Sequence, residues 1–259
     1  MTILDEIAAY ARERVAEAKK TLPPAELIDF AKSMPVDGFA FEEALKKEDI
    51  SFICECKKAS PSKGLIAEKF PYLSIASDYE TAGADAISVL TEPKWFLGKD
   101  EYLQEIAEQV QIPCLRKDFT VDDYMIYEAK VFGAKAVLLI VSLLPPETIK
   151  NYIGICDTLG LSALVETHDE KEVEIAISCG ARIIGVNNRN LKDFSVDHEN
   201  SKRLRELIPS DVIFVSESGI RDAADVEAMR QIGADAVLVG ETLMRAEDKT
   251  QKLQELRGN

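Results

Sequence analysis

Six polar residues stand at or just beyond the ends of short apolar runs, where they could donate and accept protons. They are Glu55, Lys57, Lys117, Glu166, Asn187 and Glu217. Burying a carboxylate or an ammonium group is costly unless an opposite charge pairs with it, and such pairing displaces pKa values. We interpret His168, two residues past Glu166, as structural, and His198 is not part of the set. General acid–base catalysis would therefore fall to the Glu and Lys side chains.

Small residues follow several of the same runs and could bind an anion. The candidates are Ser60, Ser218, Gly219, Gly240 and Glu241, the glycines because they let backbone N–H groups approach an oxyanion closely. Large apolar residues flank the same run ends, namely Trp95, Phe96, Phe119, Leu138 and Leu191. These apolar residues are consistent with ordinary core packing and equally with a pocket for a flat apolar ring.

An internal repeat predicts the elements that position these residues. Four similar segments, each with a glycine that could cap a helix and then an apolar strand, occupy 82–90, 132–140, 179–187 and 232–240. Four further β-rich runs complete the series at 51–57, 112–117, 163–168 and 212–218. Eight strands, each followed by a helix-length segment, predict a (β/α)8 TIM barrel, which places catalytic groups at the carboxyl ends of its strands. A doubly wound sheet is disfavoured because no G-x-G-x-x-G follows the first strand.

Residues 1–50 precede the first predicted strand and lie outside the repeat. They contain an amphipathic stretch at 3–20, a Pro-Pro break at 23–24 and two shorter helical patterns. The pattern alone fits a helix that plugs the bottom of the barrel as well as it fits a flap over the active face. We expect an N-terminal helical extension at 1–50 and a single barrel domain at 51–259.

The charge balance excludes two classes of partner. The 259 residues include 31 Lys and Arg against 46 Asp and Glu, a formal net charge of −15. Binding to the phosphate backbone of nucleic acids or to an anionic membrane needs clustered cations, so we expect neither partner. The first twenty residues lack an apolar signal core, which predicts a cytoplasmic protein.

Cysteine and histidine usage argues against a metal site. The chain has five scattered cysteines, typical of buried thiols in a reducing compartment, and only two histidines. Cys54 and Cys56 could form a metal or redox pair, but no second Cys/His pair follows them. We expect no metal and no cofactor.

The motifs at the predicted strand ends resemble the indole-3-glycerol phosphate synthase family of tryptophan biosynthesis. The resemblance rests on ECKKASPSKG at 55–64, LRKDF at 115–119, LVETHDE at 164–170, NNRNL at 187–191, SESGI at 216–220 and VGETLMR at 239–245. It runs through the whole chain, and the only mild departure is Thr242, where Ser is more usual. It also implies that residues 1–50 cover the mouth of the barrel.

The resemblance implies a reaction and a role for each candidate. A ring carbon of 1-(2-carboxyphenylamino)-1-deoxyribulose 5-phosphate would attack the ketone, CO2 would leave, and loss of water would form the indole. Lys117 would protonate the ketone oxygen, Glu166 would remove a proton during dehydration, and Lys57 would contact the substrate carboxylate. Glu55, Asn187 and Glu217 would orient hydroxyl and ammonium groups. The phosphate group would bind to Ser60, Ser218, Gly219, Gly240 and Glu241. Arg189 would support the loop after the sixth strand and belong to the same binding set. The ring pocket would contain Phe96, Phe119, Leu138 and Leu191.

Some alternatives stay open at this point. The order in which Lys57 and Lys117 act as general acids is not fixed by the sequence. A Schiff-base aldolase with Lys117 as nucleophile, and a non-catalytic phosphate-binding barrel, are compatible with the same fold. We expect a monomer, with loose association with other tryptophan-pathway enzymes as a further possibility.

Overall fold

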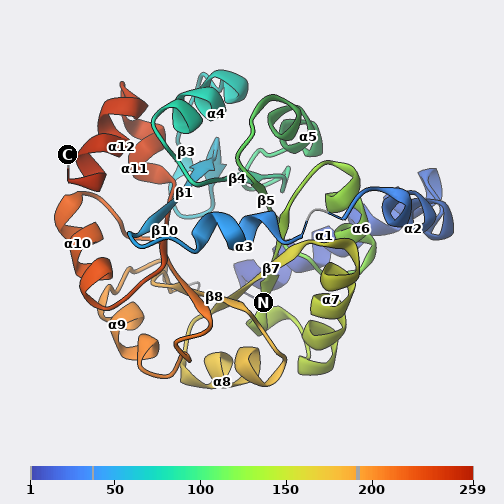
Figure 1. The fold of residues 1–259 in the computed structure, drawn as a ribbon. Coiled ribbons are helices and arrows are strands. Elements are labelled where there is room, and N and C mark those ends of the chain that lie inside the picture. The colour runs from blue at the N-terminus through green and yellow to red at the C-terminus, as the bar shows by residue number, and fades with distance from the viewer. Residues whose placement is uncertain (1, 37, 191–192, 259) are drawn as a thin grey trace.

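The barrel predicted from the repeat is confirmed in a computed structural model, which describes residues 2–36, 38–190 and 193–258. Eight parallel strands form a closed barrel in the order β1-β10-β9-β8-β7-β6-β5-β4 (Figure 1). The barrel strands are β1 (Ser51–Cys56), β4 (Ala86–Leu90), β5 (Cys114–Lys117), β6 (Ala136–Ile140), β7 (Ser162–Thr167), β8 (Ile183–Asn187), β9 (Ile213–Glu217) and β10 (Ala236–Val239). A small antiparallel pair, β2 (Ala59–Ser60) and β3 (Gly64–Leu65), follows β1.

Helices surround the barrel and precede it. The chain begins with α1 (Ile3–Thr21), α2 (Pro24–Ser33) and α3 (Ala40–Leu45). The helices between and after the strands are α4 (Tyr72–Thr81), α5 (Asp100–Gln109), α6 (Tyr124–Val131), α7 (Pro146–Leu159), α8 (Glu170–Ser178), α9 (Glu199–Arg205), α10 (Ala223–Gln231), α11 (Glu241–Arg245) and α12 (Lys249–Arg257). A 3-10 turn, Val141–Leu143, links β6 to α7.

The alternation of side chains along each strand divides the apolar residues into two cores. Ile53, Leu115 and Leu164 point into the barrel, where they belong to one buried cluster. Phe52 and Val165 point outward into a second, larger cluster shared with the surrounding helices. Because side chains alternate along a strand, the polar residues two positions after the inward ones must also face the barrel interior.

The four repeat glycines end helices just before strands. Gly83, Gly133, Gly180 and Gly233 have φ values of 87°, 83°, 85° and 75°, a left-handed conformation that glycine adopts without steric cost. The chain can therefore leave each helix and enter the next strand within a short turn.

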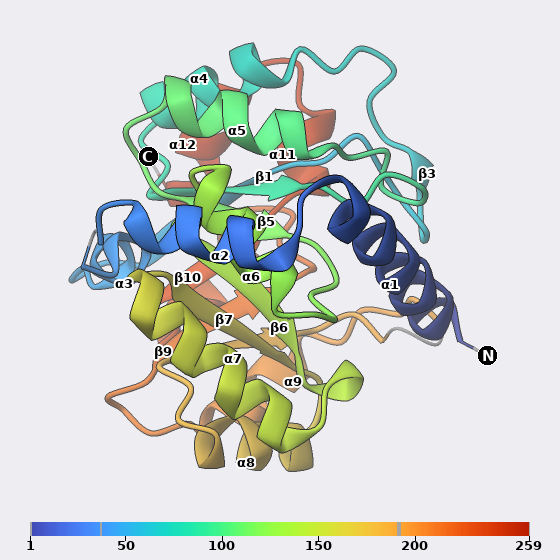
Figure 2. The ribbon, with the colours of Figure 1, turned by 90° about the vertical axis from the view of Figure 1, so that its right-hand side faces the viewer.

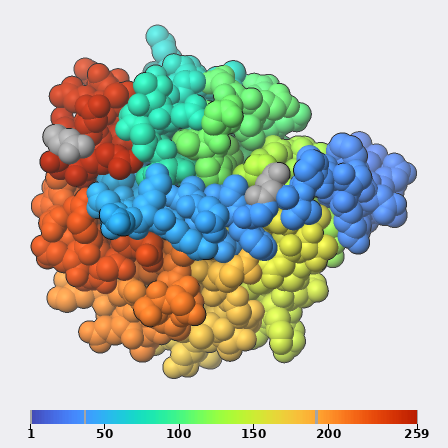
Figure 3. Space-filling model, viewed as in Figure 1, coloured from blue at the N-terminus to red at the C-terminus, as the bar shows by residue number. Residues whose placement is uncertain are grey.

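Two of the first three helices, α1 and α3, lie at opposite ends of the barrel. Figure 2 shows α1 beside one end and α3 at the opposite end. Phe41 and Leu45 of α3 are fully buried in the interior cluster, and Glu42 pairs at 2.8 Å with Arg182, which directly precedes β8. In the space-filling view of that end, α3 crosses the centre of the barrel (Figure 3). The division of the chain into an extension at 1–50 and a barrel at 51–259 stays a prediction.

Two properties of the described chain bear on the environment of the protein. No helix in the described ranges is long and apolar enough to cross a bilayer. All five cysteines are free and buried.

Candidate active site

A cavity of about 710 Å³ opens at the carboxyl ends of the barrel strands. Its lining includes every catalytic and phosphate-site candidate from the sequence, together with Phe96, Phe119 and Leu138. Leu191, the remaining candidate for the ring pocket, lies outside the described residues. The sequence candidates are thus brought together at one end of the barrel, as expected for residues that end parallel strands of one sheet.

Lys117 occupies the centre of the polar floor of this cavity. Its Nζ lies 2.5 Å from Glu217 Oε2 and 3.2 Å from Glu166 Oε2. Asn187 Nδ2 donates to the other oxygen of Glu166, Oε1, at 3.2 Å. The strand register explains this grouping, because Glu166 is paired with Gly185 of β8 and Asn187 is paired with Glu217 of β9.

The two carboxylates beside Lys117 differ in their tendency to bind a proton. Burial raises the pKa of Glu217 to about 7, with Lys117 opposing the shift and Glu166 adding to it. Burial acts on the pKa of Glu166 in the same direction, but Lys117 and then His168 hold that pKa well below its usual range. Burial alone would lower the pKa of Lys117, yet Glu217 and Glu166 outweigh it and raise that pKa well above its ordinary value. At neutral pH the floor therefore contains a lysine cation, an ionised Glu166, and in Glu217 the carboxylate that binds a proton more readily.

Lys57 forms a second ion pair on the same floor. Its Nζ lies 2.5 Å from Glu55 Oε1, and Ser88 Oγ lies 3.4 Å from Glu55 Oε2. Gly240, at the end of β10, passes directly over this pair, since a Cβ atom there would stand 2.4 Å from Glu55 Oε1 and 2.9 Å from Lys57 Nζ. A side chain at position 240 would therefore displace the charged ends of Glu55 and Lys57.

The candidates for phosphate binding form a rim beside that pair. Ser218 has a φ of 67° and Gly219 a φ of 100°, so the turn after β9 places two successive residues in the left-handed region. Gly240 directly precedes α11, and Glu241 is the first residue of that helix. Such turns direct backbone N–H groups toward one point, which suits an oxyanion. Ser60 contributes a hydroxyl from the short β2–β3 hairpin.

Arg189 follows β8 and braces its own loop. The Nη1 atom donates to the carbonyl oxygen of Phe194 at 3.1 Å, and the backbone N–H donates to Asn187 Oδ1 at 3.0 Å. The guanidinium thus braces the loop after β8, and the backbone of Arg189 contacts the floor residue Asn187.

One wall of the cavity is apolar. The rings of Phe96 and Phe119 lie 6.0 Å apart at an angle of 43°, and Leu138 adds an aliphatic surface from β6. Helix α1 contributes Ile3, Leu4 and Ile7, which the sequence did not identify as site residues. Their i, i+3 and i+4 spacing was visible as amphipathicity, but amphipathicity does not specify which surface the helix covers.

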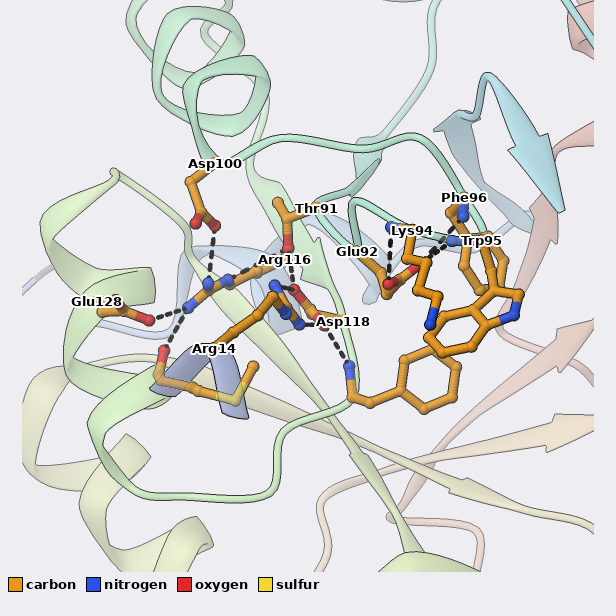
Figure 4. Close-up of polar contacts among 12 residues, drawn as sticks. Arg14, Thr91, Glu92, Lys94, Trp95, Phe96, Asp100, Arg116, Asp118 and Glu128 are labelled. Carbon is orange, nitrogen blue, oxygen red and sulfur yellow. Dashed lines mark hydrogen bonds and ion pairs between the residues drawn. The ribbon is translucent and has the colours of Figure 1, made fainter. Parts of the chain in front are cut away.

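Arg116, the arginine of the LRKDF motif, does not lie at the mouth of the cavity. It neighbours the inward-facing Lys117 on β5, so its side chain points outward, and it is 2% exposed. Its guanidinium pairs with Asp100 at 2.7 Å and Glu128 at 3.2 Å (Figure 4). Strand alternation would have placed it on the outer face.

The same outer region attaches α1 to the barrel (Figure 4). Arg14 of α1 forms two hydrogen bonds with Asp118, at 2.7 and 3.2 Å. Asp118 also accepts from Thr91 Oγ1 at 2.6 Å and from the backbone N–H of Phe119 at 2.8 Å. Because Asp118 lies between Lys117 and Phe119, this ion pair connects α1 to the segment that holds both a floor residue and a wall residue.

Other site residues were not predicted from the sequence. Arg221, Arg245 and His198 line the cavity. His168 Nε2 lies 3.3 Å from Glu166 Oε1, so the histidine that we interpreted as structural contacts a floor residue from outside the cavity lining. The motifs around these residues were recognised, but the direction of their side chains beyond the regular strands was not predictable. Among the described residues, no group of three or more His, Cys, Asp or Glu side chains is arranged to hold a metal ion.

Comparisons with known proteins agree with the motifs. The sequence profile of the indole-3-glycerol phosphate synthase family matches residues 4–256. The chain is 59% identical over 258 residues to the indole-3-glycerol phosphate synthase of Ruminiclostridium cellulolyticum, with 99% of each chain covered. It is 54% identical over 262 residues to the corresponding protein of Leuconostoc mesenteroides, covering 100% of this chain and 99% of that one.

Solved structures of other proteins share the fold. The 3-hexulose-6-phosphate synthase from Salmonella typhimurium is similar with a TM-score of 0.67 and 15% sequence identity, covering 81% of this chain and 97% of that chain. The thiamine phosphate pyrophosphorylase from Pyrococcus furiosus is similar with a TM-score of 0.60 and 18% identity, covering 81% and 94%. At such identities the likeness shows the barrel fold alone.

Proposed function

The chain belongs to the indole-3-glycerol phosphate synthase family, and from that premise we propose which of its residues carry out the reaction. The enzyme is a carboxy-lyase of tryptophan biosynthesis. Its substrate is the phosphorylated ketone 1-(2-carboxyphenylamino)-1-deoxyribulose 5-phosphate. A ring carbon attacks the ketone, the electron pair of the bond to the carboxylate returns to the ring as CO2 leaves, and loss of water completes the indole.

Lys117 is the general acid for ring closure. The ketone oxygen becomes negative as the new carbon–carbon bond forms, and a cation at the floor of the cavity can protonate it. The observation that carries this proposal is the position of Lys117 between Glu166 and Glu217, which hold it in the charged form. A Schiff-base nucleophile would instead need a neutral amine with a lowered pKa, so the raised pKa of Lys117 argues against the aldolase alternative.

Glu166 is the base of the dehydration step. It is ionised at neutral pH, lies beside the acid Lys117, and is oriented by Asn187. Glu217 holds Lys117 in place from the other side. The lowered pKa of Glu166 and the raised pKa of Glu217 make Glu166 the better candidate for the base.

The remaining candidates bind and orient the substrate. Lys57, held by Glu55, is positioned to contact the substrate carboxylate and to serve as a second acid for the leaving hydroxyl. The phosphate group binds to the rim formed by Ser60, Ser218, Gly219, Gly240, Glu241 and Arg189. The aromatic ring lies against Phe96, Phe119 and Leu138, with Leu191 as a further contact.

The chain acts as one barrel domain with its N-terminal extension, 1–50, contributing the wall from α1. We place it in the cytoplasm, in keeping with five free thiols. It requires no metal or cofactor, and we propose that it acts as a monomer.

A direct assay tests the role of Lys117. The purified chain is mixed with substrate without added metal, and indole formation is followed by fluorescence. Lys117→Met should lower kcat by at least about 10²-fold, the contribution of a general acid, while the substrate Kd stays within a few-fold. Lys46→Met, which alters a surface pair with Glu43, is the matched control and should retain activity. A Lys117→Met variant with near-wild-type turnover would remove Lys117 from this role.

A further inference from the structure

The two carboxylates that flank Lys117, Glu166 and Glu217, have very different polar partners. Glu166 faces Lys117 and Asn187 and lies 3.3 Å from His168 Nε2. Glu217 contacts Lys117 through Oε2, whereas its buried Oε1 has no hydrogen-bond partner in the described structure. The buried Nε2 of His168 also makes no hydrogen bond there, so its approach to Glu166 is an ion-pair contact. Both carboxylates contact Lys117, so that contact alone does not decide which of them carries a proton. The difference in their affinity for a proton must come from their other neighbours.

His168 is the charged neighbour found on one side only. Its Nδ1 lies 3.0 Å from Glu172 Oε2, and its backbone N–H donates to the same oxygen at 2.8 Å. With Nδ1 engaged by Glu172, the opposite edge of the ring is directed at Glu166. One imidazole thus bridges a residue of the cavity floor and a residue of α8.

The sequence fixes this arrangement through the start of α8. Asp169 caps the helix by accepting from the backbone N–H of Glu172 at 2.9 Å, which places Glu172 in the first turn. Glu172 lies four positions after His168, so its carboxylate reaches back over the turn to the ring. Asn200 of α9 completes the site by donating to the backbone carbonyl of His168 at 3.2 Å.

We propose that His168 is a positioning residue that keeps Glu166 ionised and leaves Glu217 as the carboxylate that binds a proton. The proposal deepens the function proposed above, because it rests on Glu166 as the base of dehydration. A base must be free of its proton when the ring is ready to lose one. Lys117 contacts both carboxylates, and a second cation, His168, stands beside Glu166, which secures that condition.

The charges around His168 are consistent with a permanent cation. Burial disfavours the charged ring, but Glu166 on β7 and Glu172 on α8 raise the pKa of His168 to about 10. Asn200 on α9 is neutral, and the nearby Arg203 is held by Asn200 and by Glu170 at 2.8 Å. Lys117 lies on the far side of Glu166. The ring is therefore enclosed between two carboxylates.

Coupling between two titrating groups is reciprocal, so it can be measured from the histidine without any turnover. The chain has two histidines, His168 and His198, which simplifies the NMR titration of the ring protons. We expect His168 to titrate with a pKa of about 10 and Glu166→Gln to lower that value by about one unit or more. The control is Glu170→Gln, the same change at the first residue of α8, which should leave the pKa of His168 unchanged. Titration of His168 near 6.5 in both proteins would overturn the proposal.

The pH dependence of kcat tests the consequence for catalysis. His168→Gln keeps a polar side chain facing Glu166 but removes the charge, so the proton that binds near pH 7 should pass from Glu217 to Glu166. We expect the wild-type-to-variant ratio of kcat to grow by about tenfold between pH 8 and pH 6, the effect of an acceptor pKa of about 7. His168→Arg restores a cation and should restore the wild-type profile. A ratio that stays constant with pH would indicate a merely structural histidine and would overturn the proposal.

The two measurements separate this proposal from the function on which it rests. Loss of coupling in the NMR titration contradicts His168 alone and leaves the Lys117→Met result unaffected. Strong coupling with an unchanged pH profile contradicts Glu166 as the base, and the role of His168 fails with it.

Discussion

Replacing Arg14 with Met should reveal how strongly the first helix is fixed to the barrel. Arg14 meets Asp118 through two hydrogen bonds, and the exposed fractions of the two side chains are 19% and 0%. Removing one partner of a buried pair costs about 3–5 kcal/mol, because the other charge is left buried. Asp118 would keep its bonds from Thr91 and from the Phe119 N–H, which points to the lower end, about 3 kcal/mol.

The matched control lies on the same helix. Lys19 pairs with Asp122 at 2.7 Å, but the two side chains are 33% and 30% exposed. A surface pair of this kind contributes about 0–1 kcal/mol, so Lys19→Met should change stability little. Burial is thus the main difference between two ion pairs that join α1 to the same segment after β5.

Thermal unfolding followed by circular dichroism measures the difference. At about 2–4 °C per kcal/mol for a chain of this size, Arg14→Met should lower the Tm by about 6–12 °C. Hydrogen exchange over residues 3–21 distinguishes detachment of α1 from unfolding of the barrel. If Arg14→Met and Lys19→Met prove equally mild, within about 1 kcal/mol, the reasoning from burial is refuted.

Three further predictions concern the floor and the core. Gly185→Ala places a Cβ 2.2 Å from Glu217 Oε1, and displacement of that carboxylate should lower kcat by about 10²-fold in the indole assay. Gly154→Ala is the control, because no atom lies near its Cβ, and it should keep activity. Glu217→Gln removes one of the charges that raise the pKa of Lys117, so the alkaline fall of kcat should move to lower pH; an unchanged alkaline limb would contradict the pairing. The five cysteines are buried, and burial raises the pKa of Cys114 to about 12, so a thiol reagent should label none in the native protein and five after denaturation.

The sequence was sufficient for the barrel because each strand is apolar on both faces and each repeat glycine ends a helix. Alternation then placed Glu55, Lys117 and Glu166 correctly on the inner face, since they follow inward-facing residues by two positions. The same rule would have placed Arg116 outside. Its partners Asp100 and Glu128 come from α5 and the following helix, and no strand pattern specifies them.

Prediction was weakest beyond the strand ends, where alternation no longer fixes direction. His168 follows β7 by one residue, and its position depends on the cap of α8 rather than on the strand. The spacing of His168 and Glu172 was visible, but the contact with Glu166 required the path of the turn. The N-terminal helices show the same limit. Both α1 and α3 present apolar faces, and only packing decides that α1 borders the cavity while α3 closes the opposite end.

The net charge of −15 belongs to the chain as a whole and does not describe the mouth of the cavity. The cavity lining contains six cationic side chains, Lys57, Lys63, Lys117, Arg189, Arg221 and Arg245, and five acidic ones, Glu55, Asp118, Glu166, Glu217 and Glu241. Cations therefore outnumber carboxylates in the lining of a strongly acidic chain. At a screening length of about 8 Å in physiological salt, acidic groups elsewhere contribute little at the mouth. Arg221 and Arg245 are paired with Asp225 and Glu241, each at 3.0 Å, so the local balance of the lining, and not the overall charge, decides whether an anionic substrate is attracted.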